Sequence, residues 1–379
     1  MWKTAAGSTG RLLQLCIGYF FFYVLTGIFA KVFTGGYPLR MPELSYLVSN
    51  TLGGSAIAVL VVFAARWLPL KSNRLVKWGP FTVPSEVAYI IPSGICTAIV
   101  IPGTTLMYTL KGVSVMVAMV IMRGCIIVVS RMVDAIQIRQ GILKKRVYAE
   151  ENWAVLFALL AVATNLLLLP LVNALAARGI PAPEWLGIKP SAAGGGFDLF
   201  HAVVLCLYLT AYMIRIYIMN YFKNTRGKGV PLDNQGFFAV EQISACISML
   251  ALVALFYFAA PALGWRGPLL QDFRSAVQHL DVRAVLAGVP FGIVAFFSVF
   301  IFMFKGRTAT FAGLVNRLTS LLAGTAATLF MFFVFHSSFP SAQDWVSVVF
   351  ILVAVYFLTR AERLRTAELA RSAALEPAR

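Results

Sequence analysis

Three arginines lie inside long apolar segments of the sequence: Arg123, Arg215 and Arg317. A charged side chain near the centre of a bilayer costs about 2.5–3.5 kcal/mol on the insertion scale, so it usually faces protein or water and usually has a role. A guanidinium binds a carboxylate or a phosphate through two parallel hydrogen bonds. These arginines therefore indicate recognition of an anion.

Acidic residues divide the three arginines into two groups. Arg215 lies toward one end of its segment, and Glu241 begins the next segment on the same side, so the two are predicted to form a structural ion pair. We expect no acid at the depth of Arg123 and Arg317, which favours an anionic ligand there. The alternative is structural, with a buried acid partner or with side chains that reach the interface. The acids considered all lie near segment ends: Glu86, Asp134, Asp198 and Glu241.

Residues around the two central arginines complete the candidate site. Helical spacing places Thr310, Gly313, Arg317, Ser320 and Gly324 on one face, which suits either a cavity wall or tight helix packing. Tyrosine pairs at a spacing of four occur in the first and sixth apolar segments, and the deeper member of each pair is a candidate. The predicted substrate-binding residues are Arg123, Arg317, Asn316, Ser320, Tyr23, Tyr212, Asn50 and Gln242.

The composition requires a membrane protein. The chain is 60% hydrophobic and 12% charged, whereas a soluble domain has about 25% charged residues. The net charge of +17 is explained by loop residues that orient the chain in the bilayer, so nucleic acid is not an expected partner. The expected partners are the bilayer and a small-molecule or lipid-phosphate substrate, and a homodimer stays open.

Ten segments are long and apolar enough to cross a bilayer, which takes about 20 residues each. No connection is long enough for a soluble domain, so residues 1–379 are predicted to form one all-α polytopic transmembrane domain. The segments are residues 11–34, 46–68, 84–108, 112–131, 152–174, 198–222, 238–262, 282–304, 308–336 and 342–360.

Charged residues in the loops predict the orientation. With both termini inside, the inner segments carry 21 Lys and Arg residues and the outer loops carry 8, the bias that cytoplasmic loops show. The sequence has no N-x-[ST] glycosylation site, which fits a bacterial inner membrane. We therefore expect an inner-membrane protein with both termini in the cytoplasm.

Weak internal similarity predicts two inverted five-helix repeats, residues 11–174 and 198–360, followed by a cytoplasmic tail at 361–379. Pro92-Ser93-Gly94-Ile95 matches Pro290-Phe291-Gly292-Ile293, and Arg123 matches Arg317, each five segments apart. Ser49-Asn50 and Glu241-Gln242 form a third match. Chance is the alternative, because short matches are common in membrane sequences. Inverted repeats of this kind recur in secondary transporters.

The order of these elements resembles the drug/metabolite transporter superfamily, which has ten helices in two inverted halves. The resemblance rests on Thr104-Thr105-Leu106-Met107-Tyr108, Lys111-Gly112-Val113-Ser114 and Met122-Arg123-Gly124, and on the stretch 304–328, which are similar to its paired short hairpins. It implies alternating access around a midplane site. Its sugar-phosphate and nucleotide-sugar carriers imply an anionic substrate, with a phosphorylated one among the candidates.

No catalytic, metal-binding or cofactor pattern accompanies these features. The five cysteines lie in apolar runs without a CxxC pair, the three histidines are far apart, and no Walker A or G-x-S-x-G motif occurs. The preferred function is a secondary transporter of a small polar organic anion rather than an enzyme. The alternatives are a flippase for a phosphate-bearing lipid precursor and a non-transporting scaffold or receptor.

Overall fold

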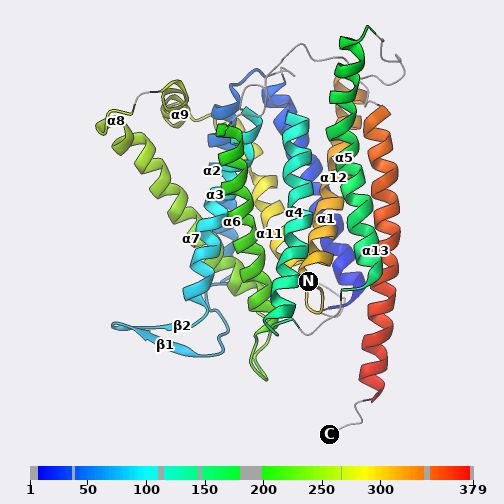
Figure 1. Ribbon diagram of the computed structural model, residues 1–379. Helices are drawn as coiled ribbons and strands as arrows, with labels where there is room; N and C mark the ends of the chain where they lie inside the picture. The colour runs from blue at the N-terminus through cyan, green and yellow to red at the C-terminus, as the bar shows by residue number, and fades with distance from the viewer. Residues whose placement is uncertain are drawn as a thin grey trace.

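The computed structural model describes residues 7–35, 39–109, 115–143, 147–179, 199–265, 267–336 and 342–375. These residues form a bundle of long helices that run side by side (Figure 1). The helices are α1 (Thr9–Thr34), α2 (Glu43–Ala64), α3 (Val87–Thr109), α4 (Val115–Arg139), α5 (Ala149–Ala177), α6 (Leu199–Asn224), α7 (Asn234–Ala254), the π-helical η2 (Leu255–Ala259), α8 (Ala260–Ala262), α9 (Pro268–Gln278), α10 (Val282–Ala287), α11 (Val289–Phe302), α12 (Ala309–Phe335) and α13 (Ala342–Leu375).

Eight helical stretches are long and apolar enough to cross a membrane within the described residues. They are α1, α2, most of α3, most of α6, α7 through α8, α10 through α11, α12 and the middle of α13. Helices α4 and α5 run alongside them in the same bundle (Figure 1). The prediction of an all-helical integral membrane protein is confirmed at this level.

Three elements differ from the sequence prediction. The connection between α2 and α3 contains an antiparallel hairpin of β1 (Leu75–Trp78) and β2 (Phe81–Pro84), and the connection after α8 contains α9. Helix α13 continues to Leu375, so most of the predicted tail at 361–379 is helical. The helix continues because Glu362 and Arg365 make buried ion pairs with Arg307 and Glu151.

Two glycines lie at close helix crossings. A Cβ on Gly94 of α3 would lie 2.7 Å from the carbonyl oxygen of Glu241 on α7. A Cβ on Gly292 of α11 would overlap the carbonyl of Gly54 on α2. These are the glycines of the two Pro-x-Gly-Ile matches, so the motif marks positions where only glycine lets two backbones meet. Accordingly, α3 packs on α6 and α7, and α11 packs on α1 and α2.

A polar network closes the end of the bundle that carries the two termini. Asp134 of α4 accepts hydrogen bonds from the backbone amides of Ala309 and Thr310, at 2.8 and 2.6 Å, and so caps the first turn of α12. Glu151 of α5 accepts from Thr308 at 2.9 Å and pairs with Arg365 of α13. These contacts join α4, α5, α12 and α13 at what we call the termini end.

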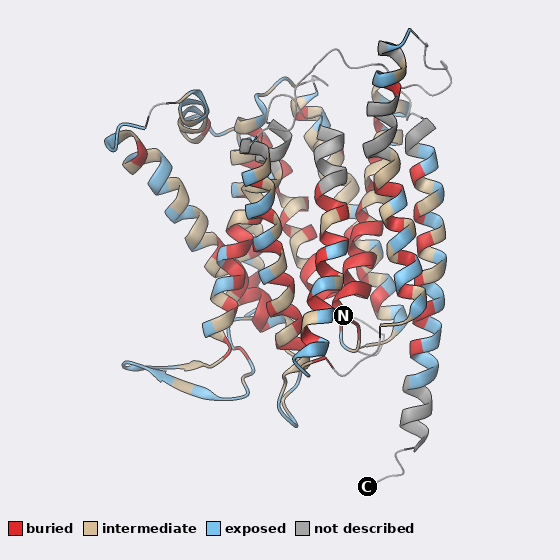
Figure 2. Ribbon diagram, in the orientation of Figure 1, coloured by how far each residue is buried: buried red, intermediate tan, exposed pale blue. Residues whose placement is uncertain are grey.

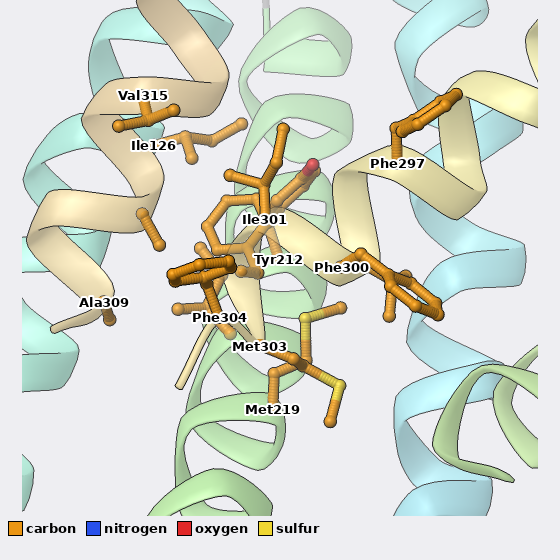
Figure 3. Packing of buried hydrophobic residues seen from close by; sticks show 14 of the residues in the cluster. Ile126, Tyr212, Met219, Phe297, Phe300, Ile301, Met303, Phe304, Ala309 and Val315 are labelled. Carbon is orange, nitrogen blue, oxygen red and sulfur yellow. The ribbon is translucent and has the colours of Figure 1, made fainter. Parts of the chain in front are cut away.

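An apolar layer lies next to that network. Phe300 and Ile301 of α11, with Met303 and Phe304 just beyond it, gather beside Met219 of α6 (Figure 3). Buried positions are concentrated in the half of the bundle nearer the termini end (Figure 2). In this structure, the termini end is the densely packed end.

The glycine crossing gives a stability prediction. Gly292→Ala should lower the free energy of unfolding by about 1–3 kcal/mol, because a methyl group forced into a packed contact displaces backbone. Gly103→Ala is the matched control: its Cβ would meet only Tyr208 atoms at 3.9 Å, so it should be neutral or stabilising by up to about 1 kcal/mol. Apparent melting temperatures in detergent measure both. Equal effects would show that the crossing is not tightly constrained.

Candidate functional site

Arg123 and Arg317 come together in the centre of the bundle, although 194 positions separate them in the sequence. Arg123 of α4 is 5% exposed and donates from Nη2 to the hydroxyl of Tyr23 on α1 at 2.9 Å, and from Nη1 to the carbonyl oxygen of Ser320 on α12 at 3.3 Å. Its guanidinium carbon also lies 5.5 Å from the centre of the Tyr23 ring. Helices α1, α4 and α12 therefore meet at this side chain.

Arg317 is buried without a counter-ion in the described part of the chain. Its side chain is 7% exposed, and its Nε and Nη2 atoms have no hydrogen-bond partner among the described residues. The guanidinium carbon lies 4.8 Å from the centre of the Tyr212 ring of α6, within the range of a cation–π interaction. Leaving buried polar atoms unsatisfied costs free energy, so these two N–H groups are available to a ligand.

Four tyrosines surround the two arginines. Tyr19 and Tyr23 of α1 have ring centres 5.4 Å apart, and Tyr208 and Tyr212 of α6 have the same separation. All four lie near the Arg317 guanidinium. Phenol rings with hydroxyl groups give the cations partial solvation while leaving room for stronger acceptors.

The two arginines make corresponding contacts in the two halves of the chain. Each guanidinium also faces the second tyrosine of a pair, Tyr23 for Arg123 and Tyr212 for Arg317. Two helix pairs thus present the same Arg–Tyr contact toward one centre.

Asn316 and Ser320 hold the site together rather than facing it with free polar groups. The Asn316 amide donates to Ser298 of α11 at 3.1 Å and accepts from the Tyr19 hydroxyl at 3.4 Å. The Ser320 hydroxyl donates to the carbonyl oxygen of Arg317 at 2.8 Å, while its own carbonyl accepts from Arg123. Both were predicted as substrate ligands; the contacts described here are structural.

In the described residues, no contact joins Asn50 or Gln242 to Arg123 or Arg317. The Asn50 amide donates to the Tyr46 hydroxyl at 3.1 Å, and its backbone packs on Gly288. Gln242 is buried with an unpartnered amide nitrogen, and no contact joins it to the arginines in the described residues. The glycine crossings suggest a different alignment from the predicted match of Ser49-Asn50 with Glu241-Gln242: Gly94 meets the carbonyl of Glu241 and Gly292 meets the carbonyl of Gly54.

Tyr19 and Tyr208 are site residues that the candidate list omitted. Each lies four positions before a chosen tyrosine, so it shares a helix face with it. Each is also nearly fully buried, at 2% and 3% exposure. The repeated spacing of four residues was the sequence signal that could have identified them. Choosing only the deeper tyrosine of each pair left the other one out.

Arg215 and Glu241 form a buried bidentate ion pair. Arg215 Nε and Nη2 lie 2.9 and 3.0 Å from the two carboxylate oxygens. Ser93 of α3 donates to the same carboxylate at 2.6 Å. The pair therefore joins α6, α7 and α3, and Glu241 is fully occupied by this contact rather than by Arg317.

The arrangement is suited to binding an anion. Arg317 offers two unpartnered N–H donors, and Arg123 and the tyrosine hydroxyls lie beside it. Within the described residues, no group of three His, Cys, Asp or Glu side chains has a geometry that could hold a metal ion. The site is a buried cationic cluster to which four helices contribute: α1, α4, α6 and α12.

Comparisons with known proteins bear on the fold alone. No protein-family model matches the chain, and no curated protein matches it. A chain from a solved structure titled "Crystal structure of protein" aligns with a TM-score of 0.52 and 18% identity, over 94% of this chain and 99% of that chain. At this identity, the match supports a shared arrangement of helices and says nothing of activity.

The ion pair gives the second prediction. Glu241→Gln or Arg215→Gln should each cost about 3–5 kcal/mol of stability, because each leaves one charge buried without its partner. Exchanging the pair, Arg215→Glu with Glu241→Arg, should recover folded yield relative to either single reversal. Size-exclusion profiles and melting temperatures measure this. Single substitutions that leave the elution profile and the melting temperature unchanged would show that the pair does not stabilise the fold.

Proposed function

We propose that this protein is a secondary transporter that moves a small polar organic anion across the membrane by alternating access around the Arg123–Arg317 centre. The observation that carries the proposal is the buried guanidinium of Arg317, with two N–H groups lacking partners. A cation in such a place is stabilised by an anionic ligand, and removing that ligand restores the penalty. The assignment is to binding and translocation, with no catalytic residue.

An inverted repeat of five helices plus five is part of this proposal. Its supports are the matching Arg–Tyr contacts and the two glycine crossings, α3 on α7 and α11 on α2. The helix contacts agree with this repeat. If each helix corresponds to the one five spans away, the pair α3–α6 corresponds to α11–α1, and the pair α4–α6 corresponds to α12–α1. All four of these pairs are in contact. This plan is that of the drug/metabolite transporter superfamily, which the sequence resembles.

The packed termini end supports alternating access. Buried ion pairs and the Asp134 cap join the helices there. In the described part of α12, every residue from Ala309 to Leu318 is buried, whereas buried and partly exposed residues alternate beyond Ser320. We infer a state closed at the termini end, in which ligand reaches the arginines from the opposite side.

A flippase is the second candidate, favoured by the outer half of α7. Between the fully buried Ala245 and Ala260, no residue of the helix is buried, and many large apolar side chains there are exposed. This stretch leans away from the bundle (Figure 1) and includes the π-helical turn η2. Glu241, which pairs with Arg215, lies one turn before this stretch, so the stretch starts close to the arginines. An acyl chain would lie along it while a phosphate headgroup occupies the arginine centre.

The central test is ligand-induced stabilisation of purified protein by phosphate esters and carboxylates. An anion that binds should raise the apparent melting temperature. Arg317→Gln and Arg123→Gln should each weaken that binding about 10- to 150-fold, the equivalent of a charge-assisted hydrogen bond of about 1.5–3 kcal/mol. Without ligand, Arg317→Gln should keep or increase stability, since a buried unpaired cation is gone.

Matched variants and probes sharpen this test. Arg131→Gln, on the same helix as Arg123 but bonded to Asn152 near the bundle surface, should leave binding unchanged. Glycerol phosphate and a fluorescent phosphatidic acid in proteoliposomes separate the two candidates: the transporter prefers the first, and the flippase moves the second. Stabilisation by an anion that survives in the double glutamine variant would remove the basis for both.

We also propose that both termini lie in the cytoplasm, as the distribution of basic loop residues favours. The loop between α6 and α7 lies at the termini end and contains the exposed Lys228. In a cysteine-free background, Lys228→Cys should resist a membrane-impermeant thiol reagent in intact cells and react in inverted vesicles. Reaction in intact cells would reverse the orientation.

A further inference from the structure

The β-hairpin between α2 and α3 has one wholly apolar face that the bundle leaves uncovered. Opposite residues of an antiparallel pair project from the same face, and the register pairs Val76 with Val83 and Trp78 with Phe81. The other face presents Leu75, Lys77, Thr82 and Pro84. Trp78 is 49% exposed and Phe81 is 71% exposed, so the apolar face ends in two open aromatic side chains.

The turn and the root hold this hairpin in a defined shape. Gly79 begins the two-residue turn at φ +58°, a value that favours glycine and suits a tight hairpin. At the root, Glu86 accepts hydrogen bonds from the Asn73 amide at 2.6 Å and from Ser72, and pairs with Arg226 of the α6–α7 connection. The hairpin is thus fixed to two connections of the bundle.

The Glu86 clamp is ionised at neutral pH. Burial opposes ionisation of this carboxyl, but the hydrogen bonds from Asn73, Ser72 and Arg226 outweigh it and lower the pKa of Glu86 below its usual value. A depressed pKa means that the clamp stabilises the folded state at neutral pH and weakens only as the pH falls through that pKa.

Position and charge identify what covers the apolar face. The hairpin projects sideways from the bundle at the level of the helix ends, across the helix axes (Figure 1). The chain from residue 44 to residue 85 has no acid and carries Arg66, Lys71, Arg74 and Lys77, of which the last three are exposed around the hairpin. Tryptophan with basic residues at this depth is typical of contact with anionic headgroups.

We propose that this hairpin is a membrane-surface anchor, with Val76, Trp78, Phe81 and Val83 seated in the headgroup region of the adjacent leaflet and the basic residues bound to anionic lipids. A two-stranded hairpin is marginally stable alone, and an apolar face of this kind needs cover. The bilayer that surrounds the bundle supplies it. The anchor holds the α2–α3 connection, and through Glu86 the α6–α7 connection, at a fixed depth. This inference rests on the membrane-protein assignment and not on the proposed substrate.

The experiment compares the two faces of the hairpin at adjacent positions. In a cysteine-free background, Phe81→Cys and Thr82→Cys are labelled with a small environment-sensitive fluorophore and placed in nanodiscs of phosphatidylcholine and phosphatidylglycerol. Lipids with a quencher near the headgroup should reduce the signal at position 81 about twofold or more relative to position 82. Trp78→Cys repeats the measurement on the apolar face.

Charge provides the second arm. Replacing phosphatidylglycerol with phosphatidylcholine, or introducing Arg74→Gln with Lys77→Gln, should reduce quenching at position 81, since basic residues near an anionic surface strengthen its attraction. Equal quenching at positions 81 and 82, or none at positions 78 and 81, would overturn the proposal. Disulfide cross-linking of Phe81→Cys between two copies, without lipid quenching, would also overturn it and would assign the face to a second copy.

Discussion

The arrangement at the centre of the bundle depends on the cost of placing guanidinium groups where water is scarce. Coulomb interactions are strong in a low-dielectric interior, so a buried cation must find a counter-ion, a set of dipoles or a ligand. Helix α6 takes part in both cases, through Arg215 and through Tyr212, which lie within one helix turn of each other. Arg215 is neutralised by Glu241, whereas Arg317 rests on the ring of Tyr212 and keeps unpartnered N–H groups. The first solution neutralises the charge within the fold, and the second leaves the donors on which the proposed anion site rests.

Close helix contacts make this arrangement geometrically possible. Gly94 and Gly292 let α3 and α11 approach α7 and α2 to backbone contact. Those contacts leave the space between α1, α4, α6 and α12 to be filled by tyrosines and arginines. Dense packing at the termini end then fixes the first turn of α12, and with it the position of Arg317. The Asp134 cap therefore positions the site at the termini end, and the glycine crossings fix the helices around it.

The proposed repeat is unequal in one respect that bears on its operation. By the spacing of the tyrosine pairs, the counterpart of Arg215 in α1 is Thr26, which bonds its own helix at Phe22. By the glycine crossings, the counterpart of Glu241 is Gly54. The second half thus carries a buried ion pair at positions where the first half has Thr26 and Gly54. Two halves with different internal bonding need not have equal free energies in the two access states.

Sequence alone determined the class of protein and the residues with the greatest electrostatic cost. Long apolar runs require a bilayer, and charged residues within them stand out against that background, so Arg123, Arg215 and Arg317 were identifiable without a structure. The partner of Arg215 was also predictable, because Glu241 lies at the same end of the next helix. These features depend on composition and on position along one helix.

Only the tertiary structure decided how side chains from distant helices share space. Asn316 and Ser320 were predicted from the face of one helix, and the structure adds their contacts with Ser298, Tyr19 and Arg123 from three other helices. The contact of the Asn50 backbone with Gly288 depends on a helix crossing that no local pattern reveals. The hairpin between α2 and α3 escaped prediction because its short strands are specified by a two-residue turn and by the remote partner Arg226 of Glu86. Rotation and depth of one helix against another are set by packing, and packing is a property of the assembled bundle.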